Sequence, residues 1–193
     1  TTMLVRPPDV PIPVIVKTNL NHGGMRELVA NIPHPSGDLS GCEDYPVVMS
    51  SDVPDAWWAD PSLCIERFIE NRENRFYRVY VAASSAVVST AANPGPLRRM
   101  ESPDWRINRF ASRASSDSPL PEQEARAVDA TRVAALALGI DFGAFDLVED
   151  QAGTLYVVDA NKTPFWGDEV QQDVVEHLAG GMTELIEGRE TSS

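Results

Sequence analysis

The feature that most constrains the fold is a pair of apolar segments in the C-terminal half, each carrying an aspartate. The segments are residues 145–148 (FDLV) and 155–161 (LYVVDAN), and the polar turn 150–153 (DQAG) lies between them. Apolar runs on either side of a short glycine-containing turn predict a β-hairpin. Pairing the two strands about this turn brings Asp146 opposite Asp159, within a residue of register.

Facing carboxylates in this hairpin indicate a metal site. Directly opposed residues lie about 5 Å apart, so two carboxylates repel each other. Asp159 and Asn161 share a face because strand side chains alternate. Two carboxylates and an amide oxygen suit a hard cation that water and phosphate complete. We therefore expect Asp146, Asp159 and Asn161 to bind Mg²⁺ or Mn²⁺; two unrelated acids on a solvated edge are the alternative.

Composition narrows the function classes. The chain has 193 residues, 42% of them hydrophobic, and no apolar run reaches the roughly 18 residues of a membrane span. The net charge of −13 argues against nucleic acid or an anionic membrane as a partner. Cys42 and Cys64 fit no zinc spacing, and the first residues lack signal-peptide features, so we expect a cytoplasmic protein with reduced thiols.

Patterning predicts further strands and two helices. Residues 1–11 are expected to be extended, and 31–62 and 93–118 irregular. Strands are expected at residues 12–17, 63–70, 75–83 and 86–90, the last two as a hairpin. Helices are expected at 119–138, with Ser118 as N-cap and Gly139 past its end, and at 168–187. Arg126 and Arg132 of the first helix are expected to be solvated.

A second motif is the strand ending in Lys17, which precedes a polar loop ending in Gly23-Gly24. A lysine at the end of an apolar strand can direct its ammonium group into a cleft, and glycines let backbone amides approach an anion. The P-loop order is absent. The motif predicts a phosphate site, with a surface lysine beside an ordinary diglycine turn as the alternative.

A third motif, residues 64–71 (CIERFIEN), suits an adenine ring. Adenine needs a flat apolar slot, an acceptor for its exocyclic amine and backbone groups for its ring nitrogens. Glu66 is placed to accept, the backbone around Arg67, Phe68 and Ile69 to face the ring, and Glu70 or Glu73 to hold a ribose. An ordinary edge strand with outward charges is the alternative.

The three motifs, in this order, resemble the ATP-grasp superfamily over about residues 12–170. The layout is strand, lysine and glycine loop; E-x-F-I; R-x-Y-V; a helix ending in L-G-I-D; then F-D…D-x-N-x-T-P. The metal triad is similar to that of D-alanine–D-alanine ligases, with Asp159 where glutamate is usual. Residues 66–69 resemble the hinge of biotin carboxylases.

The resemblance implies an α+β ATP-grasp fold, in which two small lobes with antiparallel sheets clamp ATP. Expected parts are an extended lead-in at 1–11, a nucleotide-gripping lobe at 12–74, a C-terminal lobe with the metal site at 75–190, and a tail at 191–193. Lys17, His22, Gly23 and Gly24 are then expected over the phosphates. Arg78 and Arg106 match arginines that glutamate-adding ligases place near phosphate and acyl groups, and Arg98, Arg99 and Arg109 are further candidates.

Two departures from the family bear on the substrate. Only about eleven residues precede the first expected strand, where most members have an N-terminal domain that helps to form the acceptor site. The expectation is therefore a fragment, a minimal unit, or a chain that takes its acceptor site from a partner domain or a homodimer. Ala144 stands where several ligases carry an arginine, which puts the acylphosphate contact in doubt.

The resulting functional hypothesis is an ATP- and Mg²⁺-dependent, ADP-forming ligase. It would activate a small-molecule or peptide carboxylate as an acylphosphate for attack by an amine or another nucleophile. An ATP-dependent small-molecule kinase is the first alternative, because inositol-phosphate kinases share the fold and the aspartate-x-asparagine pair. A non-catalytic nucleotide-binding module is the second.

Overall fold

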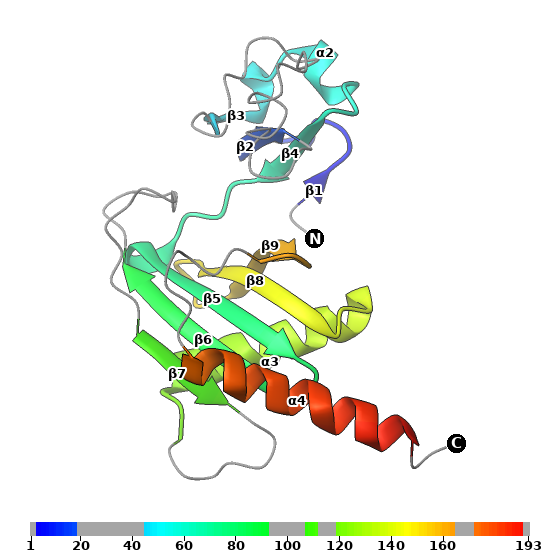
Figure 1. Cartoon of the computed structure of the whole chain (residues 1–193). Helices are drawn as coiled ribbons and strands as arrows, with labels where there is room; N and C mark the ends of the chain where they lie inside the picture. Colours follow the sequence, from blue (N-terminus) through cyan, green and yellow to red (C-terminus); the bar gives the residue numbers. More distant parts are fainter. Residues whose placement is uncertain (1–2, 19–44, 93–106, 112–118, 165–171, 191–193) are drawn as a thin grey trace. The chain divides into compact units, whose positions relative to one another are not determined.

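The computed structural model describes residues 3–18, 45–92, 107–111, 119–164 and 172–190. The chain divides into two compact units, Thr1–Phe68 and Ile69–Ser193 (Figure 1). This division falls inside the segment interpreted as an adenine hinge, earlier in the chain than the boundary expected after residue 74. None of the helices in the described part is long and apolar enough to cross a membrane.

The first unit is built on a four-stranded antiparallel sheet. Its strands are β1 (Met3–Leu4), β2 (Pro13–Thr18), β3 (Val47–Met49) and β4 (Leu63–Arg67), in the order β1-β4-β2-β3. The short helices η3 (Ser50–Asp52) and α2 (Asp55–Trp58) lie between β3 and β4 in the chain. Within the lead-in, which was expected to be extended, β1 pairs with β4.

Alternation decides which face of this first sheet is buried. Val14 and Val16 of β2 pack with Leu63 and Ile65 of β4 in one apolar cluster, which Trp57 also contacts. The residues between them, Ile15 and Lys17 on β2 and Cys64 and Glu66 on β4, therefore share the other face. Lys17 is thus held on a sheet whose opposite face is core.

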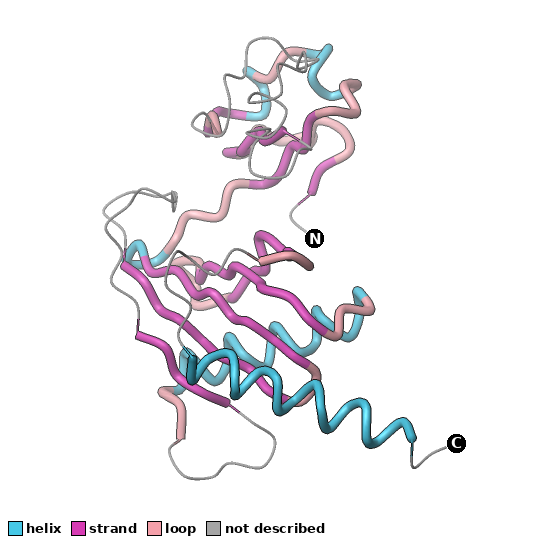
Figure 2. Tube along the Cα trace, viewed as in Figure 1, coloured by secondary structure: helices cyan, strands magenta, loops and turns pink. Residues whose placement is uncertain are grey.

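The second unit contains a five-stranded antiparallel sheet (Figure 2). The strands are β5 (Arg75–Ala82), β6 (Ser85–Ala92), β7 (Ile107–Ala111), β8 (Phe142–Glu149) and β9 (Leu155–Asn161), in the order β7-β6-β5-β8-β9. Both expected hairpins, β5–β6 and β8–β9, are confirmed. The segment 93–118 was expected to be irregular throughout, which is wrong for β7: this strand pairs with β6 over five residues.

Helices α3 (Glu122–Leu138) and α4 (Gln172–Glu190) cover opposite faces of this sheet (Figure 1). Tyr77 and Phe145 pack with Val128 of α3. Tyr80 and Ala144 face the other way and pack with α4. The sheet is therefore the middle layer of the unit, and alternate residues of every strand belong to different faces.

Both helices follow the expected patterns, but the start of α3 differs from the prediction. The helix has Pro121 at its N-cap, without a side-chain cap bond, and the expected cap Ser118 lies outside the described residues. Glu122 and Glu124 occupy the first turn of the helix. Gly139 ends the helix with φ of 62°, a left-handed conformation that glycine adopts without steric cost.

Candidate metal and nucleotide site

A row of polar positions crosses the five-stranded sheet on its α4 face. Backbone register aligns Ser89, Arg78, Asp146 and Asp159 on neighbouring strands, and the β7 residue paired with Ser89 is Asn108. The residues two positions away on β6, β5 and β8, which share this face, pack against α4 as apolar core. A polar row inside an apolar face is costly unless it has partners or a ligand.

The hairpin register places the two aspartates directly opposite each other. Asp146 pairs with Asp159, whereas Leu147 pairs with Val157, so Val158 is the extra residue of a β-bulge. Leu147 and Val157 belong to the α3-side core, and strict alternation from Val157 would turn Asp159 toward that core. The bulge therefore brings Asp159 onto the α4 face, in keeping with the frequent occurrence of bulges beside active sites.

The oxygen atoms of this hairpin form a donor set that fits a hard cation. Asp159 is exposed, and its Oδ1 accepts a hydrogen bond of 3.0 Å from the Ala160 amide. Asn161 Oδ1 accepts one of 2.8 Å from the amide of Thr163. No group of three or more His, Cys, Asp or Glu side chains is arranged for a metal within the described ranges. Two carboxylates and one amide oxygen therefore need water or phosphate to complete a Mg²⁺ shell.

Arg78 supplies the positive charge of the row. Its Nη1 lies 3.6 Å from Asp146 Oδ2, and the two side chains are 18% and 28% exposed. The guanidinium carbon lies 5.5 Å from the centre of the Tyr80 ring, within cation–π range. Arg78 Nε is buried and has no hydrogen-bond partner among the described residues. The arginine thus retains donors that an anion can use.

A second apolar cluster lies on the same face of the sheet, on the other side of the polar row from the residues that pack against α4. Phe76 and Val148, two residues from Arg78 and Asp146 on the same strands, pack with Ile69, and Tyr156 and Val158 join them. Of these, only Ile69 was a candidate from the sequence. The period-2 signal that places Arg78 and Asp146 on one face also places Phe76 and Val148 there.

In the first unit, the structure brings Lys17 and Glu66 together. Lys17 Nζ lies 3.1 Å from Glu66 Oε2, on the face opposite the apolar cluster of that unit. Cys64 lies directly across from Lys17. Burial chiefly raises the pKa of the Cys64 thiol, the Glu66 charge raises it further, and Lys17 acts in the opposite direction.

The strand that was expected to continue to Glu70 is shorter. β4 ends at Arg67, and the Phe68 amide donates a hydrogen bond of 3.0 Å to the Pro13 carbonyl. Arg67 is exposed and Phe68 is half-buried. The Phe68 amide therefore extends the β2–β4 pairing by one hydrogen bond beyond Arg67.

Two other candidate residues lie on the α3 side of the sheet, away from the polar row. Glu73 Oε2 lies 2.7 Å from Arg75 Nη2, in a cavity beside α3. Arg109 Nε lies 2.9 Å from Glu124 Oε2 of α3. His22, Gly23, Gly24 and Arg106, together with the further candidates Arg98 and Arg99, lie outside the described residues.

Comparison with solved structures identifies the architecture. A RiPP-associated ATP-grasp ligase of Chryseobacterium gregarium, in complex with ADP and a leader and core peptide, superposes with a TM-score of 0.52. The alignment covers 92% of this chain at 13% sequence identity. The chain has the ATP-grasp fold.

This chain spans about half the length of the Chryseobacterium gregarium ligase, 49%. The macrocyclase MdnC from Microcystis aeruginosa, bound to a precursor peptide, matches with a TM-score of 0.49, 12% identity, and coverage of 91% of this chain and 49% of its own. The VanG D-Ala:D-Ser ligase from Enterococcus faecalis matches with a TM-score of 0.46 and 13% identity, and the alignment covers 90% of this chain and 50% of the ligase. No protein-family model and no curated protein matches the sequence.

Proposed function

We propose that the protein is a Mg²⁺-dependent ATP-grasp enzyme that forms ADP and activates a carboxylate as an acylphosphate. The observation that carries this proposal is the Arg78–Asp146–Asp159 row on the α4 face of the sheet. Opposed carboxylates repel each other, and a cation would relieve this repulsion. The ATP-grasp fold supports nucleotide as the source of the phosphate that completes the shell.

In this proposal the polar row positions phosphate. Asp146, Asp159 and Asn161 would hold Mg²⁺, which supplies charge neutralisation to the phosphoryl oxygens. Arg78 would donate from its unused nitrogens to a phosphate oxygen or to the acyl oxygen. The lower-dielectric surroundings of this partly buried arginine make such a hydrogen bond stronger than it would be in water. Arg106 is a second candidate for donating to the phosphate or acyl oxygen.

We propose that apolar residues pack against the adenine ring, while polar residues bind the phosphates and the adenine amine. The apolar cluster of Ile69, Phe76 and Val148, with the half-buried Tyr156 and Val158 beside it, would pack against the adenine ring. Lys17 would donate to phosphate, as would the backbone of the Gly23-Gly24 loop and His22. Glu66 would accept from the adenine amine, with Arg67, Phe68 and Ile69 framing the ring.

The acceptor is proposed to be a peptide. The Chryseobacterium gregarium ligase was solved with a leader and core peptide, and this chain shares its fold. Ala144 is 2% exposed and packed under α4, so the position where several ligases carry an arginine has no room for one here. The contact to the acyl group would therefore come from Arg78 or Arg106.

The metal row is tested by MgATP binding and turnover. Asp146→Asn and Asp159→Asn should abolish Mg²⁺-dependent ADP formation, and they should leave calorimetric ATP binding in EDTA little changed. Asp129→Asn, on exposed α3, is the charge-matched control and should behave as the wild type. Full activity of the Asp159→Asn protein would overturn the assignment.

The reaction type is tested with peptide carboxylates, ATP and hydroxylamine. Acylhydroxamate together with ADP indicates the proposed ligase chemistry. ADP with a stable phosphorylated product indicates a kinase instead, and MgATP binding without any ADP indicates a nucleotide-binding module.

A further inference from the structure

A polar cavity of about 320 Å³ lies on the α3 side of the second unit, across the sheet from the metal row. Three arginines line it from different elements: Arg72 from η4 (Arg72–Asn74), Arg75 from the start of β5, and Arg126 from α3. In a chain with a net charge of −13, this is a local concentration of guanidinium groups.

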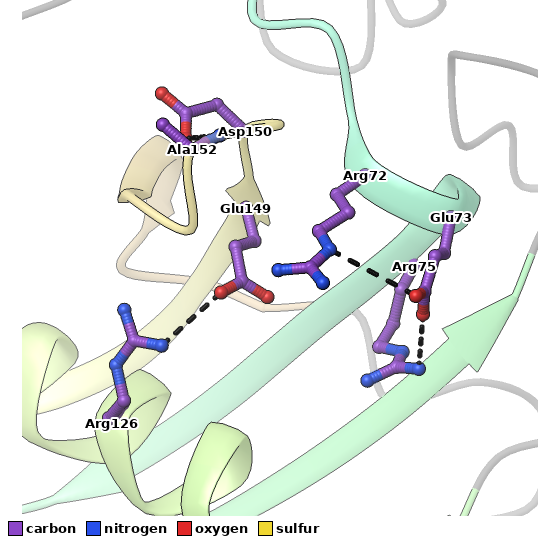
Figure 3. Close-up of polar contacts among 7 residues, drawn as sticks. All are labelled: Arg72, Glu73, Arg75, Arg126, Glu149, Asp150 and Ala152. Atoms are coloured by element: carbon purple, nitrogen blue, oxygen red, sulfur yellow. Dashed lines mark hydrogen bonds and ion pairs between the residues drawn. The ribbon is translucent and has the colours of Figure 1, made fainter.

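The three arginines have unequal partners (Figure 3). Arg126 Nη1 lies 3.2 Å from Glu149 Oε1, and Arg126 also donates to the Gly153 carbonyl. Arg75 Nη2 lies 2.7 Å from Glu73 Oε2, whereas Arg72 Nε is 3.9 Å from Glu73 Oε1. Arg126, which the sequence suggested was merely solvated, is therefore fixed, and Arg72 is the least committed of the three.

The two carboxylates of the cavity also differ. The Glu149 side chain is 8% exposed, so its charge needs Arg126 in the folded protein. The Glu73 side chain is 57% exposed, and ion pairs at such exposure contribute little to stability. Structural need therefore accounts for Arg126 and Glu149, and in part for Arg75, whose pKa is raised chiefly by a hydrogen bond to the buried Tyr77 side chain; it does not account for Arg72 and Glu73.

Backbone strain at Glu73 gives a second, independent observation. Glu73 and Asn74 have φ of 57° and 50°, two successive non-glycine residues in the left-handed region. Asparagine adopts this region readily, but glutamate does so rarely, and strained residues of this kind cluster at ligand sites. The strained turn holds a replaceable carboxylate against two guanidinium groups.

We propose that this cavity binds a compact oxyanion, a phosphate or carboxylate group, which displaces Glu73 from Arg72 and Arg75. Planar guanidinium groups bind both kinds of oxyanion through paired N–H donors. The Arg126–Glu149 pair stays intact and fixes the wall of the cavity. The proposal does not depend on the function proposed for the opposite face.

The test measures thermal unfolding of the whole chain in inorganic phosphate or succinate, against chloride at equal ionic strength. A saturable rise in the unfolding temperature of the wild type is expected with at least one of the two oxyanions. Arg72→Gln should weaken that oxyanion at least tenfold without altering stability in chloride, because the contact it removes is 3.9 Å long. Glu73→Gln should tighten binding at least threefold, since it removes the competing internal carboxylate.

Two matched variants locate the effect. Arg132→Gln removes an arginine from the same helix but outside the lining residues, and it should leave oxyanion binding unchanged. Arg78→Gln changes the opposite face, and the part of the shift that Arg72→Gln removes should persist in this variant. The proposal is overturned if neither oxyanion gives a saturable shift, if Glu73→Gln weakens binding, or if Arg78→Gln rather than Arg72→Gln abolishes it.

Discussion

The two faces of the five-stranded sheet are built from the same strands and have different tasks. On the α3 face, Tyr77, Val79 and Phe145 form a continuous apolar core, and the charges at its rim are paired. On the α4 face, apolar residues at both ends border the row that contains Arg78, Asp146 and Asp159. One face thus stabilises the unit, while the other has polar residues at its centre in place of apolar packing.

Two consecutive residues of β8 give the strongest test of the difference between the two faces. Phe145 is 0% exposed on the α3 face, so Phe145→Ala should destabilise the unit by about 3–5 kcal/mol. Asp146→Asn, on the other face, should change stability by less than about 0.5 kcal/mol, because it loses an ion pair and a repulsion together. Urea unfolding measures both, and equal losses would contradict the division of tasks.

Gly143 tests the difference between the two faces beside the polar row. A Cβ at this position would lie 2.8 Å from the Asn161 carbonyl oxygen, which is backbone and cannot turn aside. Gly143→Ala should therefore cost about 1–3 kcal/mol through overpacking. It should also weaken Mg²⁺-dependent ATP binding, because it displaces Asn161.

The matched control for Gly143 is Gly180→Ala in α4, where a Cβ meets nothing within 4 Å. That change should be neutral or stabilising, because alanine favours helix more than glycine does. Unfolding curves and MgATP calorimetry on both variants give the comparison. Wild-type Mg²⁺ dependence in a folded Gly143→Ala protein would separate this glycine from the site.

A smaller loss of stability is expected when the ion pair between Arg109 and Glu124, at the rim of the α3 face, is removed. Glu124 is largely buried, and its partners are Arg109 and the Thr90 hydroxyl. Arg109→Met should cost about 1–2 kcal/mol, below the value for a fully buried pair because the Arg109 side chain is 44% exposed. The double variant with Glu124→Gln should lose less than the single variant. A double variant that loses the sum of the two single effects would show that the pair is not coupled.

Sequence reasoning predicted the fold and the hairpin because both depend on local signals. Alternation and turn composition are legible in β5, β6, β8 and β9, and the register of Asp146 with Asp159 is confirmed. The bulge at Val158 was not predicted, because nothing in the sequence shows which of the two adjacent valines, Val157 or Val158, is the extra residue. The strand β7 was missed because its short alternation lies among arginines and serines.

Pairing between distant elements was also beyond the sequence. Arg126 was expected to be solvated, Arg109 was a further arginine candidate for the phosphate site, and Glu73 was a candidate ribose ligand. Arg126 pairs with Glu149 and Arg109 pairs with Glu124, and both pairs form only once α3 packs on the sheet. Glu73 pairs with Arg75, two residues further along the chain. The metal and nucleotide assignments of the α4 face stay predictions, and the last experiment addresses them.

The smallest effect comes from the facing carboxylates themselves. In EDTA, Asp159→Asn should stabilise the second unit by a few tenths of a kcal/mol, because it removes like-charge repulsion from directly opposed residues. ATP alone should stabilise both proteins by preferential binding to the folded state, and Mg²⁺ should increase this stabilisation in the wild type but not in the variant. Thermal unfolding with and without metal measures both signs. A variant that is less stable than the wild type in EDTA would mean that Asp159 is a structural residue, and the two faces would then differ less than we infer.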